Sequence, residues 1–174
     1  MFPELFTTTR LVLRPIGSDD AQAIFDSYGQ DPEVTRYLSW RPHKSIEDTQ
    51  AYVQMCLKAE TSQVYMMILQ SSGDVIGAFD LRKTGQAKIE CGYVLAQPFW
   101  GQGLMTEALA EVIDWALRQP SIWRIGAVAD VDNVGSIRVM EKAGLQREGV
   151  LWRWLIHPNT GNAPRDCVSF ARTR

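Results

Sequence analysis

One segment of the chain, from Tyr93 to Ala108, constrains the fold more than any other. It reads Tyr-Val-Leu-Ala-Gln-Pro-Phe-Trp-Gly-Gln-Gly-Leu-Met-Thr-Glu-Ala, so an apolar strand ends, two glycines follow one residue apart, and a helix begins at once. Glycine tolerates a positive φ and allows the backbone to approach a ligand closely. The free N–H groups of a first helical turn, with the positive end of the helix dipole, can bind phosphate. The segment therefore predicts a phosphate-binding turn between a strand and a helix.

Two glycines alone do not decide between this interpretation and a purely structural turn. A nucleoside-triphosphate loop is disfavoured because no Lys follows Gly101 and Gly103. A dinucleotide-binding fingerprint is disfavoured because Thr106 stands at its third glycine position and the preceding strand belongs to a hairpin array.

The periodicity around this turn indicates the fold class. Apolar runs at 64–69, 75–81 and 87–95 are separated by short loops, which predicts antiparallel hairpins. The amphipathic helix 104–118 and a strand at 123–129 then complete a β-α-β unit with the usual right-handed crossover. The other predicted elements are a strand at 10–14, helices at 18–29, 45–60 and 133–143, a short helix that starts at Asp31-Pro32, and strands at 147–156 and 167–171. We expect an α/β (α+β) fold with a mixed, mostly antiparallel sheet of about seven strands and helices on both faces.

Two helix starts carry recognisable capping residues. Ser18 is predicted to cap a helix whose first turn contains Asp19 and Asp20. Ser45, with Asp48 three residues later, resembles a capping box.

Composition narrows the range of functions. The 174 residues contain no repeat or linker, which predicts a single domain over 1–174. The net charge of −2 and the lack of Lys/Arg runs argue against binding to nucleic acid or to anionic membranes. Three scattered cysteines and the absence of a signal-like start favour a cytoplasmic protein with reduced thiols. Only two histidines, His43 and His157, are present, so no metal site is expected.

Several short motifs occur together in one order. They are Thr9-Arg10-Leu11-Val12-Leu13-Arg14-Pro15, Asp31-Pro32-Glu33-Val34, Ile89-Glu90-Cys91-Gly92-Tyr93, Trp100-Gly101-Gln102-Gly103 to Glu107-Ala108, Asn133-Val134-Gly135-Ser136 and Glu141-Lys142-Ala143-Gly144-Leu145. With these motifs the chain resembles the GNAT superfamily of N-acetyltransferases, and in particular the branch of Rim-type ribosomal-protein N-terminal acetyltransferases. The resemblance covers nearly the whole chain.

The resemblance implies that two parallel strands splay apart and that acetyl-CoA lies in the cleft between them. The pyrophosphate is then expected on backbone N–H groups from Gln102 to Thr106, and the pantetheine along Val94 and Leu95 like an added strand. The expected cofactor-binding residues are Val94, Leu95, Trp100, Gly101, Gln102, Gly103, Leu104, Met105, Thr106 and Asn133. Trp100 stands where the superfamily usually has Gln or Arg, so it is expected to contact something other than phosphate oxygens.

Acetyl transfer to an amine needs a proton acceptor for the ammonium, donors for the oxyanion and a proton for the leaving thiolate. Glu90 is the leading candidate for the base or for binding the amine, with a solvated strand charge or an ion pair with Lys88 or Arg82 as the alternative. The N–H near Leu95 is the expected oxyanion donor.

The acid is harder to assign. The superfamily's usual Tyr is replaced by Met140, and the resemblance assigns the position near the departing sulfur to Ser136. Asn133 can serve simply as the N-cap of its helix, and Ser136 can be an ordinary residue of its first turn. A covalent acetyl-Cys91 intermediate is disfavoured because neither His is nearby in sequence, and Cys91 is expected to be a buried small apolar residue.

The acceptor is expected to contact Tyr37, Trp40 and Arg41 together with the hairpin loop 157–165, because aromatic faces attract a cationic amine. Ordinary packing is the alternative, and is favoured more strongly for Trp152 than for Trp40. The predicted function is transfer of an acetyl group to a protein N-terminus or a small-molecule amine, by a monomer or homodimer. A non-catalytic acyl-CoA-binding module, a succinyl-CoA-dependent transferase and a nicotinamide-dependent enzyme are the alternatives.

Overall fold

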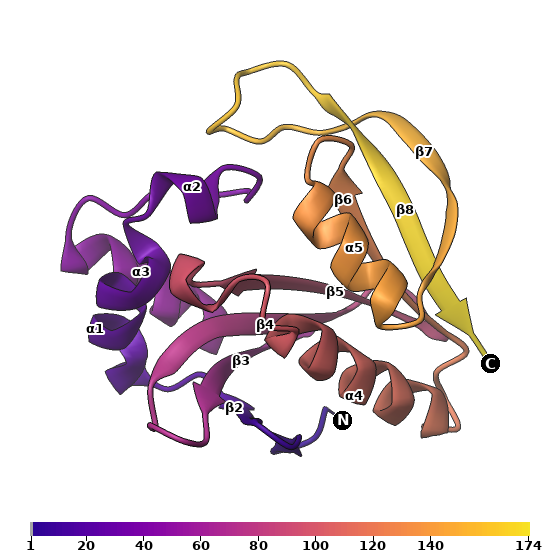
Figure 1. The fold of residues 1–174 in the computed structure, drawn as a ribbon, viewed down its shortest axis with the longest axis horizontal. Coiled ribbons are helices and arrows are strands. Elements are labelled where there is room, and N and C mark those ends of the chain that lie inside the picture. The colour runs from indigo at the N-terminus through magenta and orange to yellow at the C-terminus, as the bar shows by residue number, and fades with distance from the viewer. Residues whose placement is uncertain (1) are drawn as a thin grey trace.

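The computed structural model describes residues 2–174, and its strands form one mixed sheet (Figure 1). The strands lie in the order β1-β2-β3-β4-β5-β6-β8-β7, and every neighbouring pair is antiparallel except the parallel pair β5 and β6. The strands are β1 (Phe6–Thr7), β2 (Leu11–Pro15), β3 (Ser62–Leu69), β4 (Val75–Lys83), β5 (Lys88–Leu95), β6 (Arg124–Asp130), β7 (Gln146–Leu155) and β8 (Arg165–Thr173). The predicted sheet is confirmed with eight strands instead of about seven. The additional strand, β1, has two residues and is too short to show an alternating pattern.

Five α-helices accompany the sheet: α1 (Ala21–Ile24), α2 (Pro32–Thr35), α3 (Ile46–Leu57), α4 (Leu104–Arg118) and α5 (Val134–Lys142). The bounds of α4 agree with the sequence prediction. The predicted helix over 18–29 is divided into a 3-10 turn at Ser18–Asp20, α1, and a π turn at Phe25–Gly29. Helix α3 ends earlier than predicted.

Neither predicted serine caps its helix through its side chain, although Ser45 does stand at the N-cap position of α3. The turn after β2 begins at Gly17, whose N–H donates to Asp20 Oδ2 at 2.7 Å, so Ser18 is not its cap. At the start of α3 the side chain of Ser45 makes no capping hydrogen bond. Asp48 accepts instead from the backbone N–H of Lys44, one residue earlier than a capping box requires.

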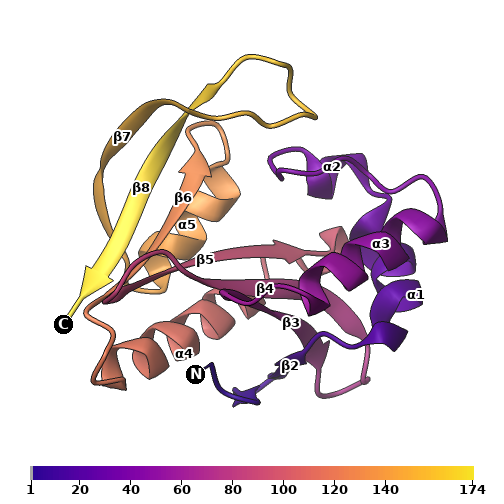
Figure 2. The same cartoon turned by 180° about the vertical axis from the view of Figure 1, so that it is seen from behind.

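The sheet is covered on both faces, and each face has its own core (Figures 1 and 2). Leu109, Val112 and Ile113 of α4 pack with the larger core, which also receives the buried side of α5. Ile24, Tyr28 and Val53, from the α1 to α3 region, pack on the other side with Met66 and Ala78. We call these two sides the α4 face and the α3 face.

The parallel pair β5 and β6 is joined along only part of its length. Lys88, Ile89 and Glu90 pair with Arg124, Ile125 and Gly126, and no register partner exists beyond Glu90. Both strands continue past this point in diverging directions (Figure 1). We call this divergence the splay.

The β7–β8 hairpin arches from the sheet edge toward the loop that follows α2 (Figure 2). Asn159 in its connecting loop donates through Nδ2 to the carbonyl of Thr35 at 2.7 Å and to that of Trp40 at 2.8 Å. The two segments that the sequence assigned to the acceptor side are therefore held together.

Candidate active site

The two-glycine turn has the backbone geometry that the sequence predicted. Gly101 has φ 74° and Gly103 has φ 77°, both in the left-handed region. Gly103 is the N-cap of α4 and supplies no side-chain cap. The first intrahelical bond runs from Glu107 N–H to the Gly103 carbonyl at 3.0 Å. The amides of 104–106 therefore remain available to a ligand such as a diphosphate.

Side chains from the turn between β1 and β2 hold the two-glycine turn, and the sequence analysis missed them. Arg10 donates from Nη1 to the carbonyl of Gln102 at 2.9 Å and from Nε to Glu107 Oε2 at 2.7 Å. Glu107 also accepts from the hydroxyl of Thr8 at 2.5 Å. Burial alone would raise the pKa of Glu107, but the bonds from Thr8 and Arg10 outweigh it and lower that pKa. The Glu of the loop motif was the available signal for this role.

In this turn, the backbone is available to a ligand, whereas several side chains pack within the protein. Leu104 and Met105 place their side chains in the larger core, so they can meet a cofactor only through the backbone. The indole Nε1 of Trp100 donates to the carbonyl of Leu95 at 2.6 Å. The indole therefore fixes the end of β5, as expected for a residue that does not face phosphate.

The hydrogen-bonding pattern determines which backbone groups of β5 point into the splay. Ala96 N–H donates to the Ile76 carbonyl at 2.8 Å, so Ala96 and every second residue before it bond with β4. Tyr93 and Leu95 have the opposite parity, and their N–H groups point toward the side where β6 has diverged. These amides can pair with an extended ligand chain.

Tyr93 also reaches across the splay. Its hydroxyl lies 2.8 Å from Oγ of Ser136 on α5. Burial raises the pKa of Tyr93, and the bond to Ser136 partly offsets that effect. Asn133 accepts from the Ser136 N–H at 3.2 Å and is thus the N-cap that the sequence allowed. Met140 is fully buried and lies in the larger core.

The residue Cys91 behaves as a buried apolar residue. It is 3% exposed within the larger core. Burial raises its pKa to about 12, which strongly disfavours the thiolate that an acetyl-cysteine route requires.

On the α3 face, charged side chains surround the splay. Glu90 stands at the last paired position of β5, exposed, and its carboxylate has no ion pair or hydrogen bond within residues 2–174. Arg82, its cross-strand neighbour, pairs with Asp80 instead, at 2.5 Å. The ion-pair alternative for Glu90 is therefore wrong in the case of Arg82. Asp80 was not singled out from the sequence.

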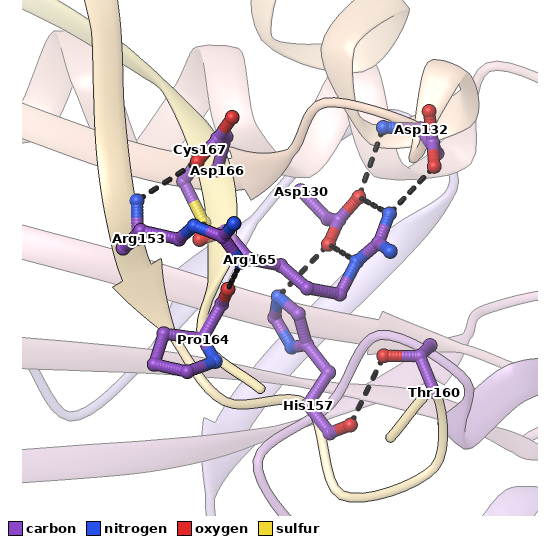
Figure 3. Close-up of polar contacts among 9 residues, drawn as sticks. All are labelled: Asp130, Asp132, Arg153, His157, Thr160, Pro164, Arg165, Asp166 and Cys167. Carbon is purple, nitrogen blue, oxygen red and sulfur yellow. Dashed lines mark hydrogen bonds and ion pairs between the residues drawn. The ribbon is translucent and has the colours of Figure 1, made fainter. Parts of the chain in front are cut away.

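At the far end of β6, a buried carboxylate anchors the hairpin loop (Figure 3). Asp130 is 1% exposed and accepts from Arg165 Nε at 2.5 Å and Nη2 at 2.9 Å. Burial alone would raise the pKa of Asp130, but the Arg165 and Asp132 bonds outweigh it and lower that pKa. His157 is 5% exposed, and its Nε2 lies 3.5 Å from Oδ2 of Asp130. The rings of Tyr37 and His157 meet edge-on, with centroids 6.1 Å apart.

The remaining acceptor candidates divide into packed and exposed residues. Trp40 stacks on His43 with ring centroids 4.8 Å apart, and its ring centroid lies 5.8 Å from that of Tyr52, so it is largely a packing residue. Trp152 is 76% exposed on the edge strand β7. The expectation that Trp152 packs more than Trp40 is wrong, because β7 is an edge strand of the sheet and residues 152–156 are all exposed. Arg41 is exposed and stays a prediction.

Known proteins match this arrangement. Residues 10–146 match the family model described as an acetyltransferase (GNAT) domain. The chain belongs to the GNAT family of acetyltransferases. It is 33% identical over 165 residues to the uncharacterized N-acetyltransferase YoaA of Bacillus subtilis (strain 168), and the match covers 92% of each chain.

Solved GNAT structures share the fold. The acetyltransferase (GNAT family) from Bacillus anthracis superposes with a TM-score of 0.85 at 25% identity, covering 97% of this chain and 98% of that one. RimL, a ribosomal L7/L12 α-N-protein acetyltransferase in complex with coenzyme A, superposes with a TM-score of 0.85 at 22% identity, covering 98% of each chain. Like its family, this GNAT protein is an acetyl-CoA-dependent N-acetyltransferase.

Two further observations concern the described residues. Between residues 2 and 174 no group of three or more His, Cys, Asp or Glu is arranged to hold a metal ion. No helix in the same range combines the length and apolar character needed to cross a bilayer.

Proposed function

We propose that this protein moves the acetyl group of acetyl-CoA directly to a primary amine in a ternary complex. The acceptor is a protein N-terminal α-amine or a small-molecule amine. The observation that carries the proposal is the splay beyond Glu90, where outward-facing amides of β5 lie beside the uncapped start of α4. An extended thioester arm with a diphosphate at its end fits this combination of groups.

Each part of the co-substrate has a proposed partner. The diphosphate contacts the backbone of Gly101, Gln102 and Gly103 and the amides of 104–106. The pantetheine arm lies along Val94 and Leu95, with Asn133 beside it, while Trp100 fixes the end of the strand. The N–H of Leu95 stabilises the oxyanion.

The leaving thiolate is proposed to meet the Tyr93–Ser136 pair. Ser136 alone is a poor proton donor, but the Tyr93 hydroxyl at 2.8 Å can supply its proton through the Ser136 hydroxyl. This pairing gives the reaction an acid even though Met140 replaces the usual Tyr.

The acceptor amine approaches from the α3 face. Glu90 is proposed to attract the ammonium or to accept its proton. Tyr37, Trp40 and Arg41 lie beside the anchored hairpin loop and are proposed to contact the rest of the acceptor.

We further propose that residues 1–174 act as one domain in the cytoplasm, as a monomer or homodimer, without nucleic-acid or membrane partners. Membership of the Rim-type branch is supported by the RimL fold likeness and by the motifs in the sequence. Light scattering on a size-exclusion column tests the oligomeric state.

The decisive assay is release of free coenzyme A thiol from acetyl-CoA. The panel contains peptides with the N-terminal sequence of ribosomal protein L7/L12, other N-terminal peptides, polyamines and small amines, and a parallel series uses succinyl-CoA. We expect thiol release with acetyl-CoA that depends on the amine. One acceptor should gain about 42 Da, because an acetyl group replaces a hydrogen. Tight acetyl-CoA binding without thiol release above the hydrolysis background for any amine would favour the non-catalytic module.

A further inference from the structure

Asp80 occupies the middle of β4 and faces the side from which we propose that the acceptor approaches. Side chains alternate along a strand, and Ala78, two residues earlier, belongs to the α3-face core. Across the ladder Asp80 is paired with Gly92 of β5, a residue without a side chain that lies just past the last β5–β6 pair. Gly92 has no side chain of its own at this position, and the guanidinium of Arg82 lies over it, with Nη1 3.5 Å from where a Cβ would stand.

The carboxylate of Asp80 is only half satisfied. Oδ2 accepts from Nη1 of Arg82 at 2.5 Å, whereas Oδ1 is buried and has no partner among the described residues. A buried carboxylate oxygen without a hydrogen bond is costly in its ionised form, and a proton or a cationic ligand removes that cost. The side chain as a whole is 24% exposed, so a ligand on the α3 face can still touch it.

On α3, the groups beside Asp80 are a phenol and a thiol. Tyr52 and Cys56 lie one turn apart on α3, and burial raises the pKa of both, with the charge of Asp80 adding to the effect. Tyr28, in the same α3-face core, is 1% exposed, and its hydroxyl also has no partner among the described residues. The positive charge beside Asp80 is the guanidinium of Arg82, so an incoming ammonium competes with that guanidinium for the carboxylate.

Burial raises the pKa of Asp80, and Arg82 offsets this only in part. A carboxylate works as a general base most effectively when its pKa has moved toward the working pH. Glu90, the other carboxylate at the splay, is exposed, and it makes no hydrogen bond or ion pair with residues 2–174.

We propose that Asp80 is the group that takes the proton from the acceptor ammonium, and that Glu90 attracts the ammonium into position. This inference rests on the proposed amine acetylation and assigns one of its steps. The N–H bond of the ammonium breaks as an O–H bond forms on Asp80. The freed lone pair attacks the thioester carbonyl and the C–N bond forms. As the C–S bond breaks and its electron pair leaves on sulfur, the sulfur takes a proton from the Tyr93–Ser136 pair. The nitrogen loses its second proton, which restores the proton of that pair, and the proton on Asp80 passes to solvent.

The test compares Asp80→Asn, Glu90→Gln and Arg82→Gln with the wild type, using the amine found by the thiol-release assay. Asp80→Asn should lower kcat by about 10²-fold or more and remove the loss of kcat at acidic pH. Arg82→Gln should keep that loss but move it to higher pH, because removing the guanidinium raises the pKa of Asp80. Glu90→Gln should raise KM for the amine and leave the pH dependence of kcat in place.

Structural damage is separable from the chemical effect. Asp80→Asn should melt at or above the wild-type temperature and bind acetyl-CoA normally, because it removes an unfavourable buried charge. The matched control Asp114→Asn, on the exposed side of α4, should match the wild type in every measurement. If the kcat of Asp80→Asn lies within threefold of the wild-type value and its pH profile is unchanged, the assignment is overturned.

A wild type that acetylates no amine would overturn the proposed function and not the chemistry of Asp80. For that case, carboxyl ¹³C NMR titration of the wild type against Asp80→Asn measures the group directly. A pKa of Asp80 above its ordinary value supports the assignment, and one at or below that value overturns it.

Discussion

The hydroxyl of Tyr93 and Oγ of Ser136 lie 2.8 Å apart, and the same hydroxyl donates to the Ser136 carbonyl at 3.3 Å, so Tyr93 links β5 to α5. Tyr93 is held in place by stacking on Phe79, with ring centroids 5.9 Å apart. Ser136 is held by the Asn133 cap. The pair therefore connects β5 to the α4 face at the point where β5 has lost β6 as a neighbour.

Removing the phenol should slow the departure of the thiolate. We expect Tyr93→Phe to lower kcat about tenfold or more, with little change in acetyl-CoA affinity, in steady-state thiol-release assays. Tyr65→Phe is the matched control, because its hydroxyl bonds the Pro3 carbonyl at 2.6 Å and should cost only about 1 kcal/mol of stability. If Tyr93→Phe keeps the wild-type kcat while the separate variant Ser136→Ala is slow, then Ser136 acts without the phenol and the proposed role of Tyr93 is wrong.

Glu90 should matter for capture of the amine. Glu90→Gln should lower kcat/KM about two- to fivefold, as expected from the 0.2–1 kcal/mol of an exposed charge pair, while the Kd for acetyl-CoA stays the same. Glu111→Gln removes a partly exposed carboxylate from α4 and serves as the control. An unaltered kcat/KM would remove Glu90 from the mechanism.

The left-handed turn should be indispensable for the co-substrate. Gly103→Val forces a β-branched residue into φ 77° and should weaken acetyl-CoA binding at least tenfold (about 1.4 kcal/mol) by calorimetry. Gly17→Ala, at φ −119° with no atom closer than 3.7 Å to the added carbon, should bind normally. Normal affinity in Gly103→Val, with an intact melting transition, would argue against a phosphate site at this turn.

The Asp130–Arg165 pair should stabilise the fold in a pH-dependent way. The folded-state pKa of Asp130 is lowered, so its contribution is present above about pH 4, the unfolded value, and is lost as the pH falls through the folded value. We expect Asp130→Asn to cost about 3–5 kcal/mol at pH 7, and the difference from wild type to shrink below pH 4 in urea titrations. A difference that does not change between pH 7 and pH 3 would contradict this sign.

Much of the fold could be predicted because its signals are local. The bounds of α4 follow from an apolar spacing within fifteen residues and from Gly103 at its start. The left-handed glycines could be expected for the same reason, since a strand followed at once by a helix needs such a turn. The order of motifs was enough to indicate the family.

The active-site details were not local. Asp80 becomes a distinctive carboxylate only because α3 covers β4 and Gly92 stands opposite it, and Asp130 only because Arg165, far along the chain, returns beside it. The preference between Trp40 and Trp152 failed for a similar reason, since the position of β7 at the edge of the sheet leaves Trp152 exposed. Backbone propensity and periodicity extend over a few residues, and therefore the sequence determined the elements and the turn. Burial and charge pairing depend on which distant strands and helices meet, and only the tertiary structure decided those.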